Sequence, residues 1–308
     1  MISYIVIGRN EEKNLRKCII GIYESVLFLG SQQYEIIYVD SKSTDKSLEI
    51  AKEFNEIKLI EITGVCNAAI ARNIGAKESK GEILFFIDAD MEINAEFIAD
   101  ILDQSGKLKF NIVSGQLIDI INGVETTRFS NKFLGGIFLI RREIWESVNG
   151  MRTKYKTGED LDLGLRLYEK GIHLHRKNSI ITKHYTTDTF DKRRMWKMIW
   201  NMSAFYARSM LYREHIFSKQ LYLKIWAVDK TFILLVLFLI LSCLISFISP
   251  FLMLIYLLSV FLRSLKQKND INILELLMYY VVINLLTIIF IFTFFPKSKQ
   301  LEYLIVKR

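Results

Sequence analysis

Short apolar runs alternate with amphipathic stretches along the first part of the chain. The apolar runs cover residues 3–8, 34–40, 57–62 and 82–90 and predict strands. Helical spacing predicts helices at 11–26, at about 43–54 with Ser43 or Thr44 as its cap, at 67–81 and at 94–104. Strands that are apolar throughout and alternate with helices indicate a parallel sheet covered on both faces.

The pattern becomes less regular after these elements. Residues 111–121 predict a strand, residues 133–150 a glycine turn followed by a strand and a short helix, and residues 157–171 an amphipathic helix. We therefore predict an α/β domain over residues 1–189, with a mostly parallel, doubly wound sheet. Ligands bind beyond the carboxyl ends of the strands in such sheets.

Residues 190–228 interleave Lys and Arg with Trp, Tyr, Phe and Met. This composition favours one or two helices lying in a bilayer interface, and an ordinary amphipathic surface helix is the alternative. Because strongly apolar segments follow directly, we favour the interfacial interpretation.

Residues 231–262 and 273–295 are mostly Leu, Ile, Phe, Val and Tyr. A membrane-spanning helix needs about 20 apolar residues, which the second run provides. The first run is interrupted by Pro250 and predicts either one long tilted helix or a hairpin. We therefore assign residues 229–308 to a membrane region with two to three hydrophobic segments, following the α/β domain as C-terminal transmembrane helices.

The sequence predicts only in part on which side of the membrane the loop, the tail and the catalytic domain lie. Basic residues follow both runs, so the positive-inside rule leaves three arrangements open: the loop outside, the tail outside, or both inside. The N-terminus lacks the basic flank of a secretory signal, which predicts a cytoplasmic catalytic domain on a multi-pass membrane protein.

Charge and cysteines narrow the function classes. The net charge of +8 over 308 residues fits attraction to anionic lipid headgroups or phosphorylated substrates. No nucleic-acid-binding motif accompanies the charge, so we expect no nucleic-acid partner. The three cysteines lack the spacing of metal ligands or of a disulfide framework, and we expect them to be reduced.

Two aspartates follow a buried strand in the stretch FFIDADMEI, residues 85–93. In a strand, residues i and i+2 point to the same side, so Asp88 and Asp90 can both reach one cation. Oxygen ligands of this kind suit Mg²⁺ or Mn²⁺. The alternative is a solvated turn. Asp40 also ends a predicted strand, and its alternative role is to hold the turn that follows.

Several motifs, in order along the chain, resemble family 2 glycosyltransferases of the GT-A fold. They are IGRNEEKNLRKCI (7–19), IIYVDSKSTDKSLEIA (36–51), AIARNIGAKESKGEILFFIDADM (69–91), GGIFLIRREIWESVNG (135–150) and GEDLDLGLRLYEKG (158–171). The resemblance covers roughly residues 1–200. Ile7 and Gly8 stand where the family more usually has proline and a small residue.

The resemblance implies a role for each candidate residue. It implies that Asp160 is the catalytic base and that Asp88, Asp90 and His184 hold the metal. A structural histidine is an equal alternative for His184. The implied substrate-binding residues are Asn10, Glu11, Asp40, Arg72, Asp88, Gly135, Gly136, Glu159, Arg193 and Arg194.

Two of these assignments have further alternatives. Arg193 and Arg194 lie in KRRMW, which resembles the arginine–tryptophan motif of processive synthases, but the preceding glutamine is missing, so processive polymerisation is not expected. Their alternative is membrane-surface charge. Glu159 and Asp160 open a helix whose N-terminus stabilises negative charge, and we expect both to be ionised at neutral pH. Their alternative role is to cap that helix.

These observations predict an inverting, metal-dependent hexosyltransferase-type enzyme. Its donor would be a nucleotide sugar, with a UDP-sugar favoured, and its acceptor a membrane lipid-linked or polysaccharide-precursor molecule of the cell envelope. The alternative is a polyprenyl-phosphate glycosyltransferase similar to dolichol-phosphate mannose synthases. A nucleotidyltransferase is disfavoured because the loop after the first strand is not glycine-rich, and a non-enzymatic membrane subunit because the acidic residues are all present.

Overall fold

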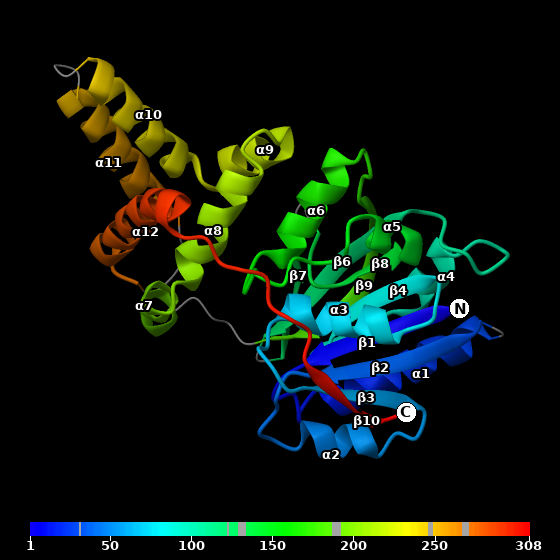
Figure 1. Ribbon diagram of the computed structural model, residues 1–308. Coiled ribbons are helices and arrows are strands. Elements are labelled where there is room, and N and C mark those ends of the chain that lie inside the picture. Colours follow the sequence, from blue (N-terminus) through cyan, green and yellow to red (C-terminus); the bar gives the residue numbers. More distant parts are fainter. Residues whose placement is uncertain (31, 122, 129–133, 187–191, 246–248, 267–270) are drawn as a thin grey trace. The chain divides into compact units, whose positions relative to one another are not determined.

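The chain divides into two compact units. The computed structural model describes residues 1–30, 32–121, 123–128, 134–186, 192–245, 249–266 and 271–308 (Figure 1). One unit comprises Met1–Asp188 and Lys297–Arg308, and the other comprises Thr189–Pro296. The predicted boundary at residues 189 and 190 lies outside the described residues. The predicted division at residue 228 falls inside the second unit, and residues 297–308 belong to the first unit rather than to the membrane region.

A ten-stranded mixed sheet forms the centre of the first unit, in the order β10-β3-β2-β1-β4-β8-β6-β9-β5, with β7 paired to β6. The strands are β1 Ile2–Gly8, β2 Tyr34–Asp40, β3 Ile57–Ile62, β4 Ile83–Asp88, β5 Met91–Ile93, β6 Ile112–Ile121, β7 Val124–Arg128, β8 Phe138–Arg141, β9 His175–Tyr185 and β10 Tyr303–Lys307. The predicted parallel arrangement holds for β3-β2-β1-β4, whereas β8 and β10 join that core antiparallel.

Helices cover both faces of this sheet, as the doubly wound prediction requires. They are α1 Leu15–Leu29, α2 Ser47–Lys52, α3 Ala68–Glu78, α4 Ala95–Ile101, α5 Arg142–Ser147 and α6 Glu159–Glu169. Alternate residues of β1 point to opposite faces: Tyr4 and Val6 are buried with α1, α2 and α4, and Ile5 and Ile7 with α3, α5 and α6. Figure 1 shows the two helical layers on either side of the strands.

Two helices begin later than predicted because polar side chains hold the preceding loops. The Glu11 N–H donates to Ser47 Oγ (2.8 Å), and the Glu12 N–H donates to Asp45 Oδ2 (3.0 Å), so α1 begins only at Leu15. The Ser43 hydroxyl donates to Asp40 Oδ1 (2.5 Å) and caps no helix. The predicted cap at Ser43 or Thr44 is therefore wrong, and α2 begins at Ser47.

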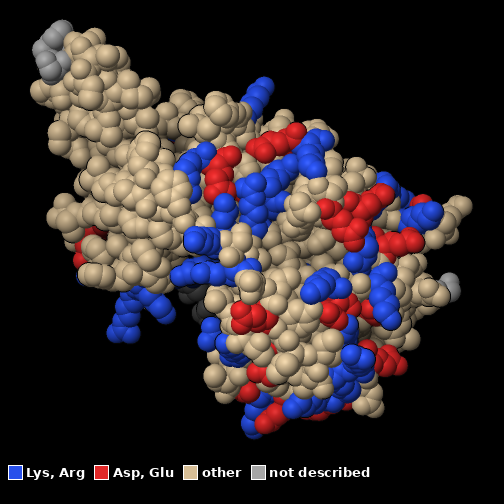
Figure 2. Space-filling model, in the orientation of Figure 1, with Lys and Arg blue, Asp and Glu red and all other residues tan. Residues whose placement is uncertain are grey.

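The second unit is helical. Its helices are α7 Lys192–Trp200, α8 Ser203–Glu214, α9 Lys219–Val228, α10 Lys230–Leu244, α11 Ser249–Leu265 and α12 Ile273–Thr293. Helix α8 packs on α12, and α11 packs on both α10 and α12. Because α10 and α11 are separate helices that pack together, the structure favours the hairpin alternative for residues 231–262. Much of this unit's visible surface carries no charged side chains (Figure 2).

Among the described residues, one helix, α12, is long and apolar enough to cross a membrane. Residues 219–227 and 230–244 would together provide a second span, although the two helices are bent by 106°. Helix α11, with 17 residues, is shorter than a typical span.

A buried carboxylate joins four elements of the second unit. Asp229, 4% exposed, accepts hydrogen bonds from Arg263 Nη1 (2.6 Å), from Tyr212 (2.8 Å) and from Arg208. Asn284 on α12 accepts a further bond from Arg208 (3.0 Å). Since a buried charge is costly unless it is paired, this network explains how an aspartate is tolerated among apolar helices.

Candidate active site

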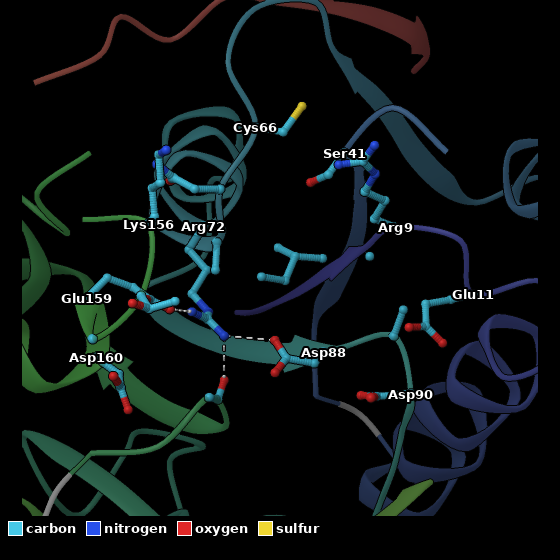
Figure 3. Close-up of a pocket in the computed structure, with 18 residues that line it drawn as sticks. Arg9, Glu11, Ser41, Cys66, Arg72, Asp88, Asp90, Lys156, Glu159 and Asp160 are labelled. Carbon is cyan, nitrogen blue, oxygen red and sulfur yellow. Dashed lines mark hydrogen bonds and ion pairs between the residues drawn. The ribbon is translucent and has the colours of Figure 1, made fainter. Parts of the chain in front are cut away.

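A cavity of about 640 Å³ lies at the carboxyl ends of β1, β2 and β4 in the first unit. This is the edge of a parallel sheet at which ligands bind. Its lining residues are Ile7, Gly8, Arg9, Glu11, Ser41, Cys66, Asn67, Ala68, Arg72, Asp88, Ala89, Asp90, Gly136, Lys156, Thr157, Gly158, Glu159 and Asp160. Figure 3 shows the labelled charged side chains around this space.

The Asp88-Ala89-Asp90 turn lies on the cavity floor, between the end of β4 and the start of β5. The Ala89 N–H donates to the Ile7 carbonyl (2.9 Å), and the Asp90 carbonyl accepts from the Tyr185 N–H (2.9 Å). The turn is thus tied to β1 on one side and β9 on the other. One third of the Asp88 side chain is exposed, so its carboxylate is open to the cavity.

Arg72 of α3 spans the cavity floor. Its side chain is only 2% exposed, and it donates to Asp88 Oδ1 (2.7 Å), Glu159 Oε1 (3.0 Å) and the Gly136 carbonyl (3.2 Å). Burial alone would lower the pKa of Arg72, but Asp88, Glu159 and Asp160 outweigh it and raise the pKa. Both terminal nitrogens are thus engaged within the protein, and the predicted contact with the nucleotide stays a prediction.

Glu159 and Asp160 begin α6 on the other side of Arg72 from Asp88 and Asp90 (Figure 3). Gly158 precedes them with φ +77°, a left-handed conformation that favours glycine. Burial raises the pKa of Glu159, with Arg72 opposing this effect. The direction is opposite to that expected from the helix N-terminus alone, because the helix end lies inside the protein.

His184 of β9 is held between two carboxylates. Its Nε2 lies 3.2 Å from Asp90 Oδ2, and its Nδ1 lies 2.8 Å from Asp119 Oδ1. Strand register explains the arrangement, since His184 pairs with Met91 of β5 and with Asp119 of β6. Burial would lower the pKa of His184, but hydrogen bonds to the two aspartates raise it to about 9. The structure thus places His184 beside Asp90, and its role as a metal ligand stays a prediction.

Asp40 and Asn10 are used to build the neighbouring loops. Asp40 is fully buried and accepts hydrogen bonds from Tyr38, from the Ser43 hydroxyl and from the Ser43 N–H. Asn10 Oδ1 accepts from the Thr44 N–H (2.8 Å). Neither residue lines the cavity, so the turn-holding alternative describes Asp40 here, and a contact with the base stays a prediction. Glu11 does line the cavity.

The glycine pair and the arginine pair are each only partly explained by the cavity. A Cβ on Gly136 would lie 2.6 Å from Asp88 Oδ2, whereas one on Gly135 would meet nothing within 4 Å. Of the two glycines, Gly136 lines the cavity. Arg193 and Arg194 lie on the exposed start of α7 in the second unit, and their predicted contact with a phosphate stays a prediction.

Several functional candidates were not predicted from the sequence. Asp119 lies on a predicted strand, but its pairing with the strand of His184 was not predicted. The cavity residues Arg9, Ser41, Cys66, Asn67 and Lys156 were also not predicted as site residues. Arg9, Ser41 and Cys66 follow the ends of β1, β2 and β3, so their position after a strand was the available signal.

Comparisons with protein families agree with this geometry. A family model described as Glycosyl transferase family 2 matches residues 3–175. A second model, Glycosyl transferase family group 2, matches residues 116–295.

Individual relatives give the same result. The probable glycosyltransferase YdaM of Bacillus subtilis is 27% identical over 242 residues, which cover 68% of this chain and 55% of the relative. The chain thus spans about half the length of that relative. A Methanococcus voltae protein named as a transferase to dolichyl N-acetyl-alpha-D-glucosaminyl phosphate is 25% identical over 62% of this chain and 68% of its own length.

Among solved structures, Staphylococcus aureus TarS residues 1–349, in complex with UDP-GlcNAc, has a TM-score of 0.50. The sequence identity is 16%, and the match covers 71% of this chain and 74% of that one. At this identity the similarity concerns the fold, and it supports the α/β, GT-A-like prediction.

Proposed function

Because the chain belongs to glycosyl transferase family 2, we propose that it is an inverting, metal-dependent transferase that moves a hexose from a nucleotide sugar to a membrane lipid-linked or polysaccharide-precursor acceptor. The observation that carries this proposal is the cavity in which Arg72 separates two carboxylate pairs. Asp88 and Asp90 form the donor side, and Glu159 and Asp160 form the acceptor side.

The donor-side residues fit a divalent cation. The Asp90 Oδ1 atom is buried and has no hydrogen-bond partner within the described part of the chain. Five carboxylates and three basic side chains line the cavity, an excess of negative charge that disfavours an anionic donor unless a cation is added. Asp88 and Asp90 would hold Mg²⁺ or Mn²⁺, which would stabilise the charge on the leaving diphosphate.

His184 is the proposed third protein ligand. In the described ranges no three His, Cys, Asp or Glu side chains are arranged to hold an ion by themselves. This is compatible with Mg²⁺ chemistry, in which one or two carboxylates act together with substrate phosphates. His184 Nε2 lies close enough to Asp90 to share an ion with it, and Asp119 orients the imidazole through Nδ1.

Asp160 is the proposed general base. It would accept the proton of the acceptor hydroxyl as that oxygen attacks the anomeric carbon. A single displacement with the base and the leaving group on opposite sides of the sugar inverts the anomeric centre. Glu159 holds Arg72 through one carboxylate oxygen and would contact the acceptor, and Arg72 keeps the two carboxylate pairs apart.

The donor and acceptor classes have separate support. The solved TarS structure contains UDP-GlcNAc, which favours a UDP-sugar donor here. The Methanococcus relative is named for a dolichyl-phosphate-linked sugar acceptor. In this chain, α12 is long and apolar enough to cross a membrane. Both observations favour a lipid-linked acceptor. The alternative is transfer to a polyprenyl phosphate itself, as in enzymes of the dolichol-phosphate mannose synthase type.

Connectivity restricts how the chain crosses the membrane. The chain leaves the first unit after Asp188 and re-enters it at Lys297, and that unit can lie on only one side. On this premise the number of crossings between these points is even, which disfavours the arrangement with the tail outside. If α12 crosses, one further crossing is needed, and the bent segment of residues 219–244 is long enough to supply it, with α11 packed beside it but not crossing. We propose this two-crossing protein, with its catalytic unit in the cytoplasm.

The test is a donor screen on full-length protein in membranes supplied with lipid extract and Mn²⁺. Released nucleotide and labelled lipid are measured, with Asp160→Asn and Asp90→Asn as matched inactive variants. We expect one UDP-sugar to label a lipid and both variants to lose that label. Labelling of purified polyprenyl phosphate would support the alternative acceptor. Activity of Asp160→Asn equal to wild type would refute the proposed base.

A further inference from the structure

The segment that follows α12 returns to the first unit beside two loops that lead into the cavity wall, and it then becomes strand β10. Residues 299–302, here called the tail clamp, contact the loop after β3 and the loop before α6. The Glu302 carbonyl accepts from the Thr63 N–H (2.9 Å) and the Gly64 N–H (3.3 Å). Tyr303 then pairs with Ile62 as β10 joins β3.

Thr153 is the point at which the tail clamp meets the loop before α6. Its hydroxyl donates to the Lys299 carbonyl (2.8 Å) and accepts from the Lys299 N–H (2.8 Å). Thr153 is 8% exposed, so this reciprocal pair is made by a buried side chain. One hydroxyl therefore provides both hydrogen bonds between the loop and residue 299.

The same residue also reaches α3. The Thr153 carbonyl accepts from Asn67 Nδ2 (2.9 Å), and Asn67 Oδ1 caps α3 by accepting from the Ile70 N–H (2.8 Å). Two residues earlier, Met151 exchanges two hydrogen bonds with Asn73 of α3. Because α3 carries Arg72, the loop, the helix and the tail clamp form one connected support.

The two loops held by the tail clamp provide much of one cavity wall. The loop after β3 leads to Cys66, Asn67 and Ala68, and the loop that contains Thr153 leads to Lys156, Thr157 and Gly158. The second loop ends where Glu159 and Asp160 begin α6. The tail clamp therefore holds the loop that leads to the start of α6, on the side of the cavity that carries the proposed base.

We propose that the tail clamp is a positioning element of the active site, which holds the Thr153 loop so that Asp160 meets the acceptor in the productive geometry. The inference rests on the proposed function for its catalytic consequence. A displacement of about 1 Å at such a site can lower a rate on the order of 100-fold. The competing explanation is that residues 299–307 only cover the edge of β3 and thereby stabilise the sheet.

Three variants of the full-length protein separate these explanations. Thr153→Val keeps the shape of the side chain and removes both bonds to Lys299, whereas Thr153→Ser keeps a hydroxyl. Tyr303→Phe removes the bond from Tyr303 to Glu78 (2.7 Å) at β10, outside the clamp. The readouts are kcat and KM for transfer, the melting temperature, and amide hydrogen exchange of residues 151–158.

The positioning role predicts a selective effect. In Thr153→Val, the backbone amides of residues 151–158 should exchange faster than in wild type. The kcat for transfer should fall about 10- to 100-fold, while the KM for the donor changes less than about threefold. Thr153→Ser and Tyr303→Phe should resemble wild type in kcat. The proposal is overturned if Thr153→Val and Thr153→Ser have equal exchange and equal kcat, or if kcat falls only in proportion to the folded fraction.

The hydrogen-exchange arm does not depend on the proposed function. If the wild-type protein transfers no sugar from any donor, the proposed function fails, but exchange in Thr153→Val still decides whether the tail clamp orders the loop. If transfer is observed and exchange does not respond, the clamp fails while the function stands.

Discussion

The substitution Gly136→Ala tests how closely Asp88 and Arg72 pack at the cavity floor. The Cβ of Gly136→Ala would lie 2.6 Å from Asp88 Oδ2 and 3.2 Å from Arg72 Nη2. The neighbouring Gly135 offers a matched control, because its Cβ would meet no atom within 4 Å. Neither glycine has the left-handed φ that would strain an alanine, so the two substitutions differ mainly in what the methyl group touches.

The expected magnitude follows from the contact. A forced contact of this kind typically costs about 1–3 kcal/mol. Rotation of the Asp88 carboxylate relieves it more easily than movement of the sheet, so the cost falls on the ion pair with Arg72 at 2.7 Å. At about 1.4 kcal/mol per tenfold in rate, kcat/KM should fall roughly 5- to 150-fold. Gly135→Ala should remain within about twofold of wild type.

The assay compares the two variants side by side. Transfer kcat/KM is measured at saturating Mn²⁺, Mn²⁺ affinity by titration, and folding by the melting temperature. Gly136→Ala should lose activity and bind Mn²⁺ more weakly, and its melting temperature should lie a few degrees below that of Gly135→Ala, because the same contact strains the folded state. The resemblance to the family's glycine pair instead predicts that both glycines matter. Equal kcat/KM in two folded variants would refute the steric argument at Gly136.

Three further outcomes are expected. Asp119→Ala should weaken Mn²⁺ binding about 10- to 100-fold, and should have no further effect in a His184→Gln background, since Asp119 acts through His184. Asp229→Asn should lower the stability of the second unit by about 3 kcal/mol in a denaturation experiment, because two arginines lose their buried counter-ion. In a cysteine-free background, Asn272→Cys and Lys299→Cys should react with an impermeant thiol reagent from opposite membrane faces; labelling from one face would show that α12 does not cross.

The parallel part of the fold was predictable because its signal is local. Each of the first four strands is an apolar run, and the burial of nearly every residue in β1 and β4 explains why the run is continuous. Asp88 and Asp90 stand where such a run ends, so their position at the carboxyl end of β4 was predictable. The register between strands then brings these residues to one edge without further information.

Of the pair His184 and Asp119, the sequence predicts only His184 as a site residue. His184 was identified through the family resemblance, but β9 has a mixed polar sequence, HRKNSIITKHY, with no continuous apolar run. The relevance of Asp119 depends on its pairing with His184 across two strands that are far apart in sequence. Such a pair carries no local pattern, so the second partner of His184 was missed.

For Asp40, the sequence predicts the position of the residue but not the direction of its carboxylate. The sequence placed it correctly at the end of β2, but position at a strand end does not fix the direction of a carboxylate. Three hydrogen bonds from Tyr38 and Ser43 turn it into the loop. The donors lie within three residues of Asp40, so the competing turn interpretation was present in the same stretch of sequence.

The tail shows how context can outweigh a correct local signal. Residues 303–307 alternate between half-buried and exposed positions, with Leu304 and Val306 exposed, and this period of two is typical of an edge strand. Proximity to the apolar run at residues 273–295 instead predicts that these residues belong to the membrane region. A strand needs an edge with unpaired N–H and C=O groups, and β3 provides one. That pairing returns the chain to the first unit, and it places the tail clamp beside the Thr153 loop.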